Sequence, residues 1–396
     1  MKKMTKSILI CLFCLISIPS NSQQMNIYSD FPGGNLLIDK IKGDTIWVRP
    51  DMRDTEGDWF YWYFAVSNAE GRKLTFVFNK PNQFTIMGTS ISMDGAKTWQ
   101  WQGGDASETN RFTYQFATNG EVRFSMGIPY TQENFDSFMR QFKGNRWIWQ
   151  SALCQTKKGR TAELVKIKNP FKVPNMKVLV TARNHACEMM GDYLMEGIIL
   201  EVMNNTWLKE NVEFVFLPFM DKDGVEDGDQ GKNRLPRDHN RDYSEISIHE
   251  TTAALRKMEP LWSENKLKIA LDLHCPWIKN VDNEHIMLVG SDNKEMERKQ
   301  LVFSDILEKS KKSELTYFTS GMALSGKLDW NDPKKSLPKG DSFQKWSAKI
   351  PGVNMTTTIE FPYSYNSGQL ISAQNAVAFG KDVAVAMELY LKQLEK

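Results

Sequence analysis

The segment from residue 178 to residue 202 constrains the fold of this chain more than any other part of the sequence. It begins with the apolar run Val178–Val180, which is typical of a buried strand, and continues through a short polar loop. Apolar residues between 195 and 202 then repeat at the i, i+3, i+4, i+7 spacing of an amphipathic helix. From about residue 126 onward, strand and helix patterns alternate in the same way. This alternation predicts an α/β domain.

Two polar side chains of that loop, His185 and Glu188, can turn toward one cation. They lie three residues apart, at the carboxyl end of the expected strand. That end is where open α/β sheets place their chemistry. Imidazole nitrogen and carboxylate oxygen are ligands that zinc accepts, and a hydrolytic zinc site needs a third protein ligand and an open position for water.

Two later apolar strands also end in polar residues. Residues 266–275 form a short apolar run that reaches His274, and alternation places Asp272 on the same face. Residues 354–363 contain a β-branched strand that ends in Glu360. If these strands meet at the same sheet edge, His274 becomes the third metal ligand. Glu360 then becomes a candidate general base for a water molecule on the metal.

The N-terminal part of the chain, residues 23–125, has a different pattern. Short aromatic and β-branched runs, such as residues 44–48, 73–79 and 84–88, are separated by Gly, Asn and Asp. This pattern is typical of a small antiparallel β-sandwich. We therefore expect a sandwich domain at 23–125 that packs closely on an α/β domain at 126–396. We expect core positions, rather than a carbohydrate-binding surface, for the aromatic residues Trp59, Tyr61, Trp62, Tyr63, Trp99 and Trp101.

Residues 1–22 are predicted to be a signal peptide. They combine three lysines with about a dozen consecutive, mostly apolar residues and a small polar end. Such a segment is too short for a transmembrane helix, so we expect export to the periplasm or the extracellular space and no membrane span afterwards. The net charge of +2 creates no basic field, and we find no nucleic-acid motif and expect no nucleic-acid partner. The remaining length is comfortable for two domains.

Three cysteines remain beyond residue 22: Cys154, Cys187 and Cys275. Three cysteines do not make a disulfide framework. Cys187 and Cys275 each adjoin a proposed metal ligand, so they could pair, join the metal shell or pack as small apolar residues. Packing is the default expectation.

These blocks, in this order, resemble the zinc carboxypeptidase family (the carboxypeptidase A-like enzymes), and most closely its cytosolic-carboxypeptidase branch. The family's His-Pro-Gly-Glu metal motif is matched by His185-Ala186-Cys187-Glu188. Its Asn-Pro-Asp-Gly turn and Asp-Leu-Asn-Arg segment are matched by Asp223-Gly224 and Asp238-His239-Asn240-Arg241. Its third-ligand strand and catalytic-glutamate strand are matched by residues 272–274 and 358–363. Four ordered blocks are much more specific than one motif.

The resemblance implies a mixed-sheet carboxypeptidase-like catalytic domain, preceded by a small accessory sandwich. It implies one zinc ion held by His185, Glu188 and His274, with Glu360 as the general base. It implies that Arg237 stabilises the negative oxygen of the transition state, with Arg234 as the nearest competitor. Asn240 and Arg241 would bind the terminal carboxylate of a peptide substrate. The expected protein is a secreted zinc metallocarboxypeptidase that hydrolyses the C-terminal amide bond of peptides.

The sequence departs from the family pattern at two places. Residues 185–188, which we call the metal loop, have Ala186-Cys187 in place of Pro-Gly. Asp221-Lys222 stands in place of Asn-Pro. Neither change removes a ligand, but both leave the substrate class open. One alternative is a zinc-dependent amidase, esterase or deacylase that acts on a non-peptide or cell-wall substrate. A second alternative is a non-catalytic binding protein on the same scaffold.

Overall fold

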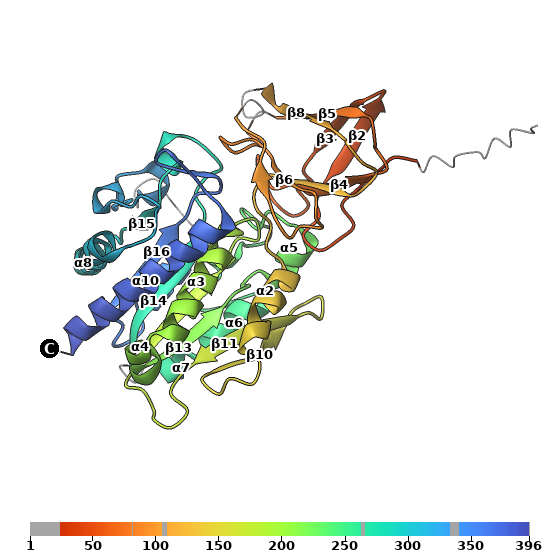
Figure 1. The fold of residues 1–396 in the computed structure, drawn as a ribbon. Coiled ribbons are helices and arrows are strands. Elements are labelled where there is room, and N and C mark those ends of the chain that lie inside the picture. The colour runs from red at the N-terminus through yellow and green to blue at the C-terminus, as the bar shows by residue number, and fades with distance from the viewer. Residues whose placement is uncertain (1–23, 81, 105–108, 263–265, 333–339, 396) are drawn as a thin grey trace, which may run out of the picture.

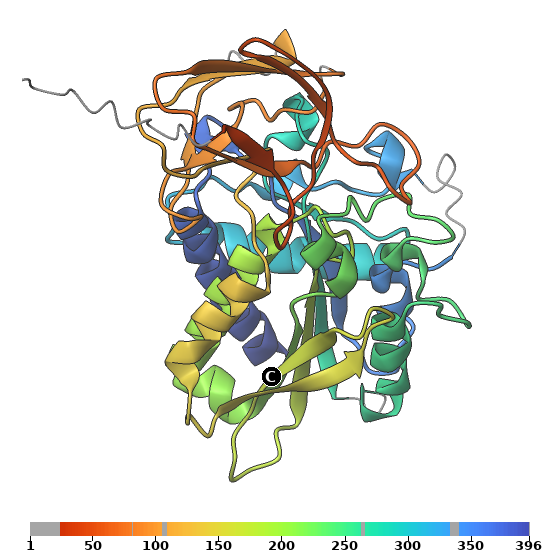
Figure 2. The same ribbon diagram turned by 90° about the vertical axis from the view of Figure 1, so that its right-hand side faces the viewer.

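The computed structural model describes residues 24–80, 82–104, 109–262, 266–332 and 340–395. In this part of the chain, a seven-stranded sheet with helices on both faces forms the larger unit, and two smaller sheets stack on one end of it (Figures 1 and 2). The expected signal peptide, residues 1–22, lies outside the described residues. None of the described helices is long and apolar enough to cross a membrane.

The seven-stranded sheet is mixed, as expected. From one edge to the other its strands are β10 (Ile148–Gln155), β11 (Thr161–Ile167), β13 (Val212–Leu217), β12 (Met176–Ala182), β14 (Leu267–His274), β16 (Met355–Glu360) and β15 (Met287–Val289). The four central strands β13, β12, β14 and β16 are parallel, whereas β10, β11 and β15 run antiparallel to their neighbours. Parallel strands are covered on both faces, which explains their nearly continuous apolar sequences.

Helices cover both faces of this sheet. They are α2 (Gln132–Met139), α3 (Met190–Asn204), α4 (Thr206–Asn211), α5 (Lys222–Asp227), α6 (Glu250–Lys257), α7 (Glu259–Trp262), α8 (Lys294–Ser310), α9 (Phe343–Ser347) and α10 (Ala373–Leu394). Val178 and Val180 of β12 share a core with α3, α8 and α10, while Leu179 between them shares a second core with α6, α7 and α9. Alternation along one strand therefore supplies both cores.

Shorter elements complete the larger unit. They are the 3-10 helices η1 (Arg140–Phe142), η2 (His239–Arg241), η3 (Val281–Asn283), η4 (Thr319–Gly321) and η5 (Asp329–Asn331), and the hairpin strands β17 (Tyr365–Asn366) and β18 (Gln369–Leu370). Of these, η2 contributes directly to the candidate site.

The helices α3 and α10 lie side by side on one face of the sheet (Figure 1). Two glycines, Gly197 and Gly380, allow their close approach. A Cβ atom on Gly380 would lie 2.2 Å from the carbonyl oxygen of Leu194 and 3.0 Å from Cα of Gly197. No side chain fits at this crossing without moving a helix backbone.

The N-terminal sheets form the expected sandwich. One sheet contains β1 (Asn26–Tyr28), β4 (Tyr63–Ser67), β9 (Val122–Ser125), β6 (Ser90–Ser92) and β7 (Gln100–Trp101), and the other contains β2 (Leu37–Lys42), β3 (Thr45–Arg49), β5 (Lys73–Phe78) and β8 (Arg111–Gln115). Phe64 and Phe124 of the first sheet pack against Phe76 and Phe112 of the second, with ring centroids 5.0 Å apart for Phe64 and Phe76 and 5.2 Å apart for Phe112 and Phe124. Aromatic packing therefore joins the two sheets.

Two details of the sandwich differ from the sequence prediction. The strands β3 and β5 pair in parallel, because the chain crosses into the other sheet as β4 before it returns. Residues 84–88 form a turn instead of a strand, and its ends meet in an isolated bridge between Thr85 and Gly88. Tyr61, Trp62 and Tyr63 are buried in the core as expected.

We predict that Gly380→Ala lowers the free energy of unfolding by about 1–3 kcal/mol, because the added methyl group overpacks the crossing of α3 and α10. Urea denaturation followed by circular dichroism measures this change. Lys381→Ala, at the next and exposed position of the same helix, should change stability by less than about 0.5 kcal/mol. Equal stability of both variants would contradict the packing argument.

Candidate metal centre

The candidate site lies at the carboxyl ends of three neighbouring parallel strands. The loop after β12 carries His185 and Glu188, β14 ends at His274, and β16 ends at Glu360. In the register of the sheet, His274 is paired directly with Glu360. The structure therefore brings together the four residues that the sequence placed at separate strand ends.

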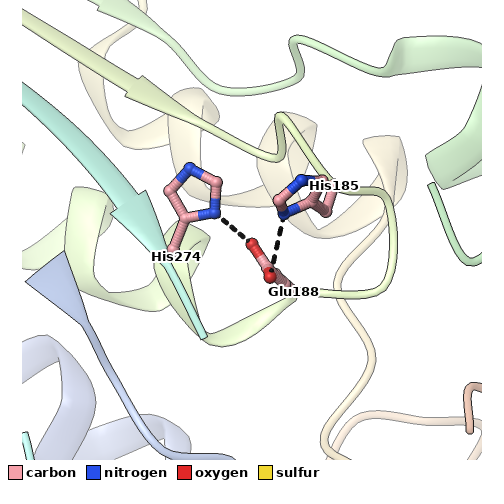
Figure 3. Close-up of side chains that lie close together, drawn as sticks. All are labelled: His185, Glu188 and His274. Atoms are coloured by element: carbon pink, nitrogen blue, oxygen red, sulfur yellow. Dashed lines mark hydrogen bonds and ion pairs between the residues drawn. The ribbon is translucent and has the colours of Figure 1, made fainter. Parts of the chain in front are cut away.

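His185, Glu188 and His274 form a compact, buried cluster (Figure 3). Nδ1 of His185 lies 3.0 Å from Oε1 of Glu188, and Nδ1 of His274 lies 2.6 Å from Oε2 of the same carboxylate. One ligand atom from each residue lies within 4.8 Å of the others. Two imidazole nitrogens and one carboxylate oxygen at this spacing fit a single divalent cation, and they match the donor set of hydrolytic zinc sites.

A carboxylate lies behind each histidine ring, at hydrogen-bond distance for His274 and at ion-pair distance for His185. Nε2 of His274 lies 2.7 Å from Oδ2 of Asp272, so Nδ1 is the nitrogen that faces Glu188. Oδ1 of Asp272 accepts hydrogen bonds from Thr181 and Asn184. Nε2 of His185 lies 3.8 Å from a carboxylate oxygen of Asp238. A carboxylate behind each imidazole is the arrangement that fixes the tautomer and ring orientation of metal-ligating histidines.

The metal loop is held by backbone contacts to a buried arginine and to the segment 230–232. The side chain of Arg183 donates a hydrogen bond to the carbonyl of Ala186 and forms an ion pair with Asp192. The backbone of Arg183 has a positive φ of 58°. Gly231 has a φ of 76°, and a Cβ there would lie 2.3 Å from the backbone nitrogen of Ala186. Glycine is therefore required where segment 230–232 crosses the metal loop.

Gln230 extends this contact to the sandwich. Its backbone carbonyl accepts a hydrogen bond from the Cys187 nitrogen. Its side chain accepts from the backbone nitrogen of Tyr61 and donates to the carbonyl of the same residue, at 2.7 and 2.8 Å. One buried amide thus ties the metal loop to the N-terminal sheets.

A lysine that no sequence motif indicated also lies in the site. The ammonium group of Lys232 forms an ion pair with Glu188. Burial alone would raise the pKa of the Glu188 carboxyl, but Lys232, His185 and His274 hold that pKa well below its usual value. Only the neighbouring Gly231 signals this position in the sequence, because it marks a close backbone approach.

Glu360 differs from Glu188 in its surroundings. Its Oε2 atom is shielded from solvent and has no hydrogen-bond partner among the described residues. Burial raises the pKa of the Glu360 carboxyl above its usual value, against the opposing effect of His274. A carboxyl group with a raised pKa and a free oxygen suits both proton uptake and proton return.

These residues open onto a cavity of about 1200 Å³. The expected site residues that line it are His185, Asn240, Arg241, His274 and Glu360, and Lys232 joins them. Arg241 and Asn240 belong to η2. Oδ1 of Asn240 accepts a hydrogen bond from the backbone nitrogen of Phe343, which fixes its orientation at the cavity wall.

Arg237 is not among the residues that line this cavity. Its guanidinium group donates to Asp242 and to the carbonyl of Ile246, at 3.0 and 2.8 Å. Arg234 is also engaged elsewhere, in ion pairs with Asp54, Asp221 and Asp229. The structure therefore does not place either arginine with the other site residues, because both guanidinium groups are held by carboxylates outside the cavity lining.

The cysteines form no disulfide among the described residues, and two further histidines lie outside the metal-ligand cluster. Cys154, Cys187 and Cys275 are free thiols, and the last two are buried beside the metal loop and β14. His239 is buried against His249, with ring centroids 3.7 Å apart, and burial lowers the pKa of His239 to about 3. Neither histidine belongs to the metal-ligand cluster found in the described residues.

Solved structures of metallo-carboxypeptidases share this fold. A metallo-carboxypeptidase from Burkholderia cenocepacia superimposes with a TM-score of 0.73 at 16% identity, covering 93% of this chain and 99% of the other. A metallo-carboxypeptidase from Pseudomonas aeruginosa, solved in complex with (2-guanidinoethylmercapto)succinic acid, gives a TM-score of 0.72 at 17% identity and covers 93% of this chain and 100% of the other. The chain therefore has the metallo-carboxypeptidase fold over nearly all of its length.

Comparison of sequences also finds similarity to carboxypeptidases. Human cytosolic carboxypeptidase 2 is 23% identical over 283 residues, which are 63% of this chain and 30% of the human protein. An uncharacterized protein of Zymomonas mobilis is 21% identical over 244 residues, which are 58% of this chain and 62% of that protein. The chain thus spans 30% of the length of the human relative. No family model matches the chain. These comparisons confirm the resemblance to the zinc carboxypeptidases and to their cytosolic branch.

Proposed function

We propose that this protein, which has the metallo-carboxypeptidase fold, is a zinc-dependent metallocarboxypeptidase that removes C-terminal residues from peptides. One observation carries the proposal: a His-Glu-His cluster and the carboxyl group of Glu360 meet at one sheet edge, beside a cavity that also contains an arginine. The similarity to solved metallo-carboxypeptidases supports it. Two alternatives remain: an amidase, esterase or deacylase, and a non-catalytic binding protein. The predictions at the end of this subsection distinguish them from a carboxypeptidase.

His185, Glu188 and His274 would hold the zinc ion. When bound, zinc supplies Lewis-acid polarisation for the attacking water and the scissile carbonyl. Glu360 accepts a proton from that water and later returns it to the amine that leaves. Its raised pKa and unpartnered Oε2 atom support both steps.

The negative charge that develops on the carbonyl oxygen needs a fixed positive group close to the metal. Lys232 lines the cavity and pairs with Glu188, whereas Arg237 is bound to Asp242 outside the cavity lining. We therefore assign this role to Lys232 instead of Arg237.

The clamp for the substrate's terminal carboxylate would be Asn240 and Arg241. A guanidinium fork matches the two oxygens of a carboxylate better than a point charge does. Both residues line the cavity and come from one short helix, η2. The Pseudomonas aeruginosa protein, which shares this fold, was solved in complex with a succinic acid derivative, and this supports a substrate that carries a carboxylate.

The same proposal includes export to the periplasm or the extracellular space. The lysines and the apolar run of residues 1–22 support it. A mature protein that retains residues 1–22, as measured by intact mass after expression in the native host, would contradict export by cleavage.

We predict that Glu360→Gln retains one zinc ion per chain but loses about 10²–10⁴-fold in turnover, because an amide cannot accept the proton. His185→Ala should instead lose the stoichiometric zinc, because it removes a ligand. Metal analysis and peptide digestion of both purified variants distinguish the two roles. Activity of Glu360→Gln within tenfold of wild type would move the general base elsewhere.

We predict that Lys232→Met lowers kcat by about 10²–10³-fold at saturating zinc, as for loss of one oxyanion-stabilising group. Lys232→Arg should recover part of the activity, since it restores the positive charge. Arg237→Ala, which removes a cation outside the cavity lining, serves as the matched control and should stay within tenfold of wild type. The opposite ranking of the two variants would return the role to Arg237.

We predict that peptides with a free C-terminus are cut at least tens of times faster than the same peptides with an amidated C-terminus. An unpaired charge in the closed site costs roughly 2–5 kcal/mol. Arg241→Ala should erase most of this difference, and Arg241→Lys should restore it only in part. If the wild type cuts both forms equally, the exopeptidase function is wrong and the amidase or esterase alternative gains.

A further inference from the structure

One tryptophan of the N-terminal sandwich lines the cavity of the candidate metal centre. Trp59, which precedes β4, was expected in the sandwich core, but it is only partly buried and forms part of the cavity wall. Its indole nitrogen donates a hydrogen bond to the carbonyl of Glu56 at 3.0 Å. The polar edge of the ring is therefore satisfied, and the ring is left to make apolar contacts.

A second tryptophan from the larger unit completes this wall. Trp277 also lines the cavity, and it lies three residues after the proposed ligand His274. The centroids of the Trp59 and Trp277 rings are 5.1 Å apart, with a 57° angle between their planes. Phe60 packs perpendicular to Trp277 at 5.1 Å and contacts Tyr363 at 5.8 Å, so buried rings support the pair from behind.

Backbone contacts hold Trp59 at a fixed place relative to the metal loop. The backbone nitrogen of Glu56 donates to the carbonyl of Asn233, and the nitrogen of Leu235 donates to the carbonyl of Asp54. These bonds join the chain just before Trp59 to the residues just after Lys232. The wall is therefore built jointly by both parts of the protein.

Lys232 connects this wall to the reacting groups. Its Nζ atom lies 5.5 Å from the centroid of the Trp59 ring and pairs with the proposed zinc ligand Glu188. In the proposed function, Lys232 faces the oxygen of the scissile carbonyl. That carbonyl belongs to the residue that precedes the cut bond. A ring in contact with Lys232 would then lie within reach of the side chain of that residue.

We propose that Trp59 and Trp277 form an aromatic subsite that binds a flat aromatic side chain on the penultimate residue of the peptide, which precedes the cut bond. This inference rests on the proposed function and extends it to a substrate class. Two tilted indole rings favour offset or edge-to-face contacts with a third ring, and such contacts add to the burial of apolar area. The sandwich is then part of the substrate site, and its removal would remove one wall.

The experiment compares two peptides that differ only in the penultimate residue, Phe in one and Ala in the other, with the same free C-terminal residue. The wild type should cut the Phe peptide with a kcat/KM at least about fivefold higher. Trp59→Ala should bring the ratio of the two kcat/KM values close to one, and Trp59→Phe should retain most of the wild-type ratio. Trp277→Ala should also reduce it.

Trp47→Ala is the matched control. Trp47 belongs to the same sandwich, is partly buried, and has the Nζ atom of Lys40 5.3 Å from its ring centroid, but it does not line the cavity. This variant should keep the wild-type preference. A loss of preference in Trp47→Ala equal to that in Trp59→Ala would overturn the subsite, because the effect would then come from general damage to the sandwich.

Calorimetric binding of both peptides to the zinc-loaded Glu360→Gln variant separates the subsite from the proposed reaction. Tighter binding of the Phe peptide than of the Ala peptide, lost when Trp59→Ala is added, supports the subsite even if no peptide is cut. If the zinc-loaded wild type cuts neither peptide, the carboxypeptidase function alone is overturned. Cleavage of both peptides at equal rates by the wild type and by Trp59→Ala would overturn the subsite and leave the carboxypeptidase function standing.

Discussion

Parallel pairing of β12, β14 and β16 is the constraint on which the rest of this protein depends. Because these strands run in the same direction, their carboxyl ends reach one edge of the sheet. The register then sets His274 directly beside Glu360 and brings the loop of His185 and Glu188 next to both. The backbone hydrogen bonds of the sheet thus position the metal ligands and the proposed base, and side-chain contacts such as that of Asp272 with His274 orient them.

Burial of so many charges at this edge is stable only because each charge has a partner. Glu188 faces two imidazoles and the ammonium group of Lys232, and His274 is backed by Asp272. An isolated buried carboxylate or ammonium group would be strongly destabilising. Glu360 differs from Glu188, since its Oε2 atom has neither a hydrogen-bond partner nor an ion-pair partner in the described part of the chain. Such a group is expected where a proton has to be taken up and released.

The sandwich has a direct role in the site. Gln230 joins the metal loop to the backbone of Tyr61, and the segment before Trp59 is hydrogen-bonded to the segment after Lys232. These contacts pass through the same short stretch, residues 230–235, which also carries the close glycine approach at Gly231. One irregular segment therefore sets the position of the lysine, the metal loop and the aromatic wall relative to each other.

The sequence by itself determined the central strands of the larger sheet, the helix that follows the metal loop, and the polar residues at the ends of those strands. Apolar alternation and the 3.6-residue period depend only on neighbours along the chain, so they identified β12, β14, β16 and the helix α3, together with His185, Glu188, His274 and Glu360. The tertiary structure alone decided what depends on contacts between distant segments. It placed Lys232 in the cavity and left Arg237 on Asp242, paired β3 in parallel with β5, and moved Trp59 from the core to the cavity wall. No local pattern encodes these outcomes, because loop paths and lateral strand order are set by packing between elements far apart in the chain.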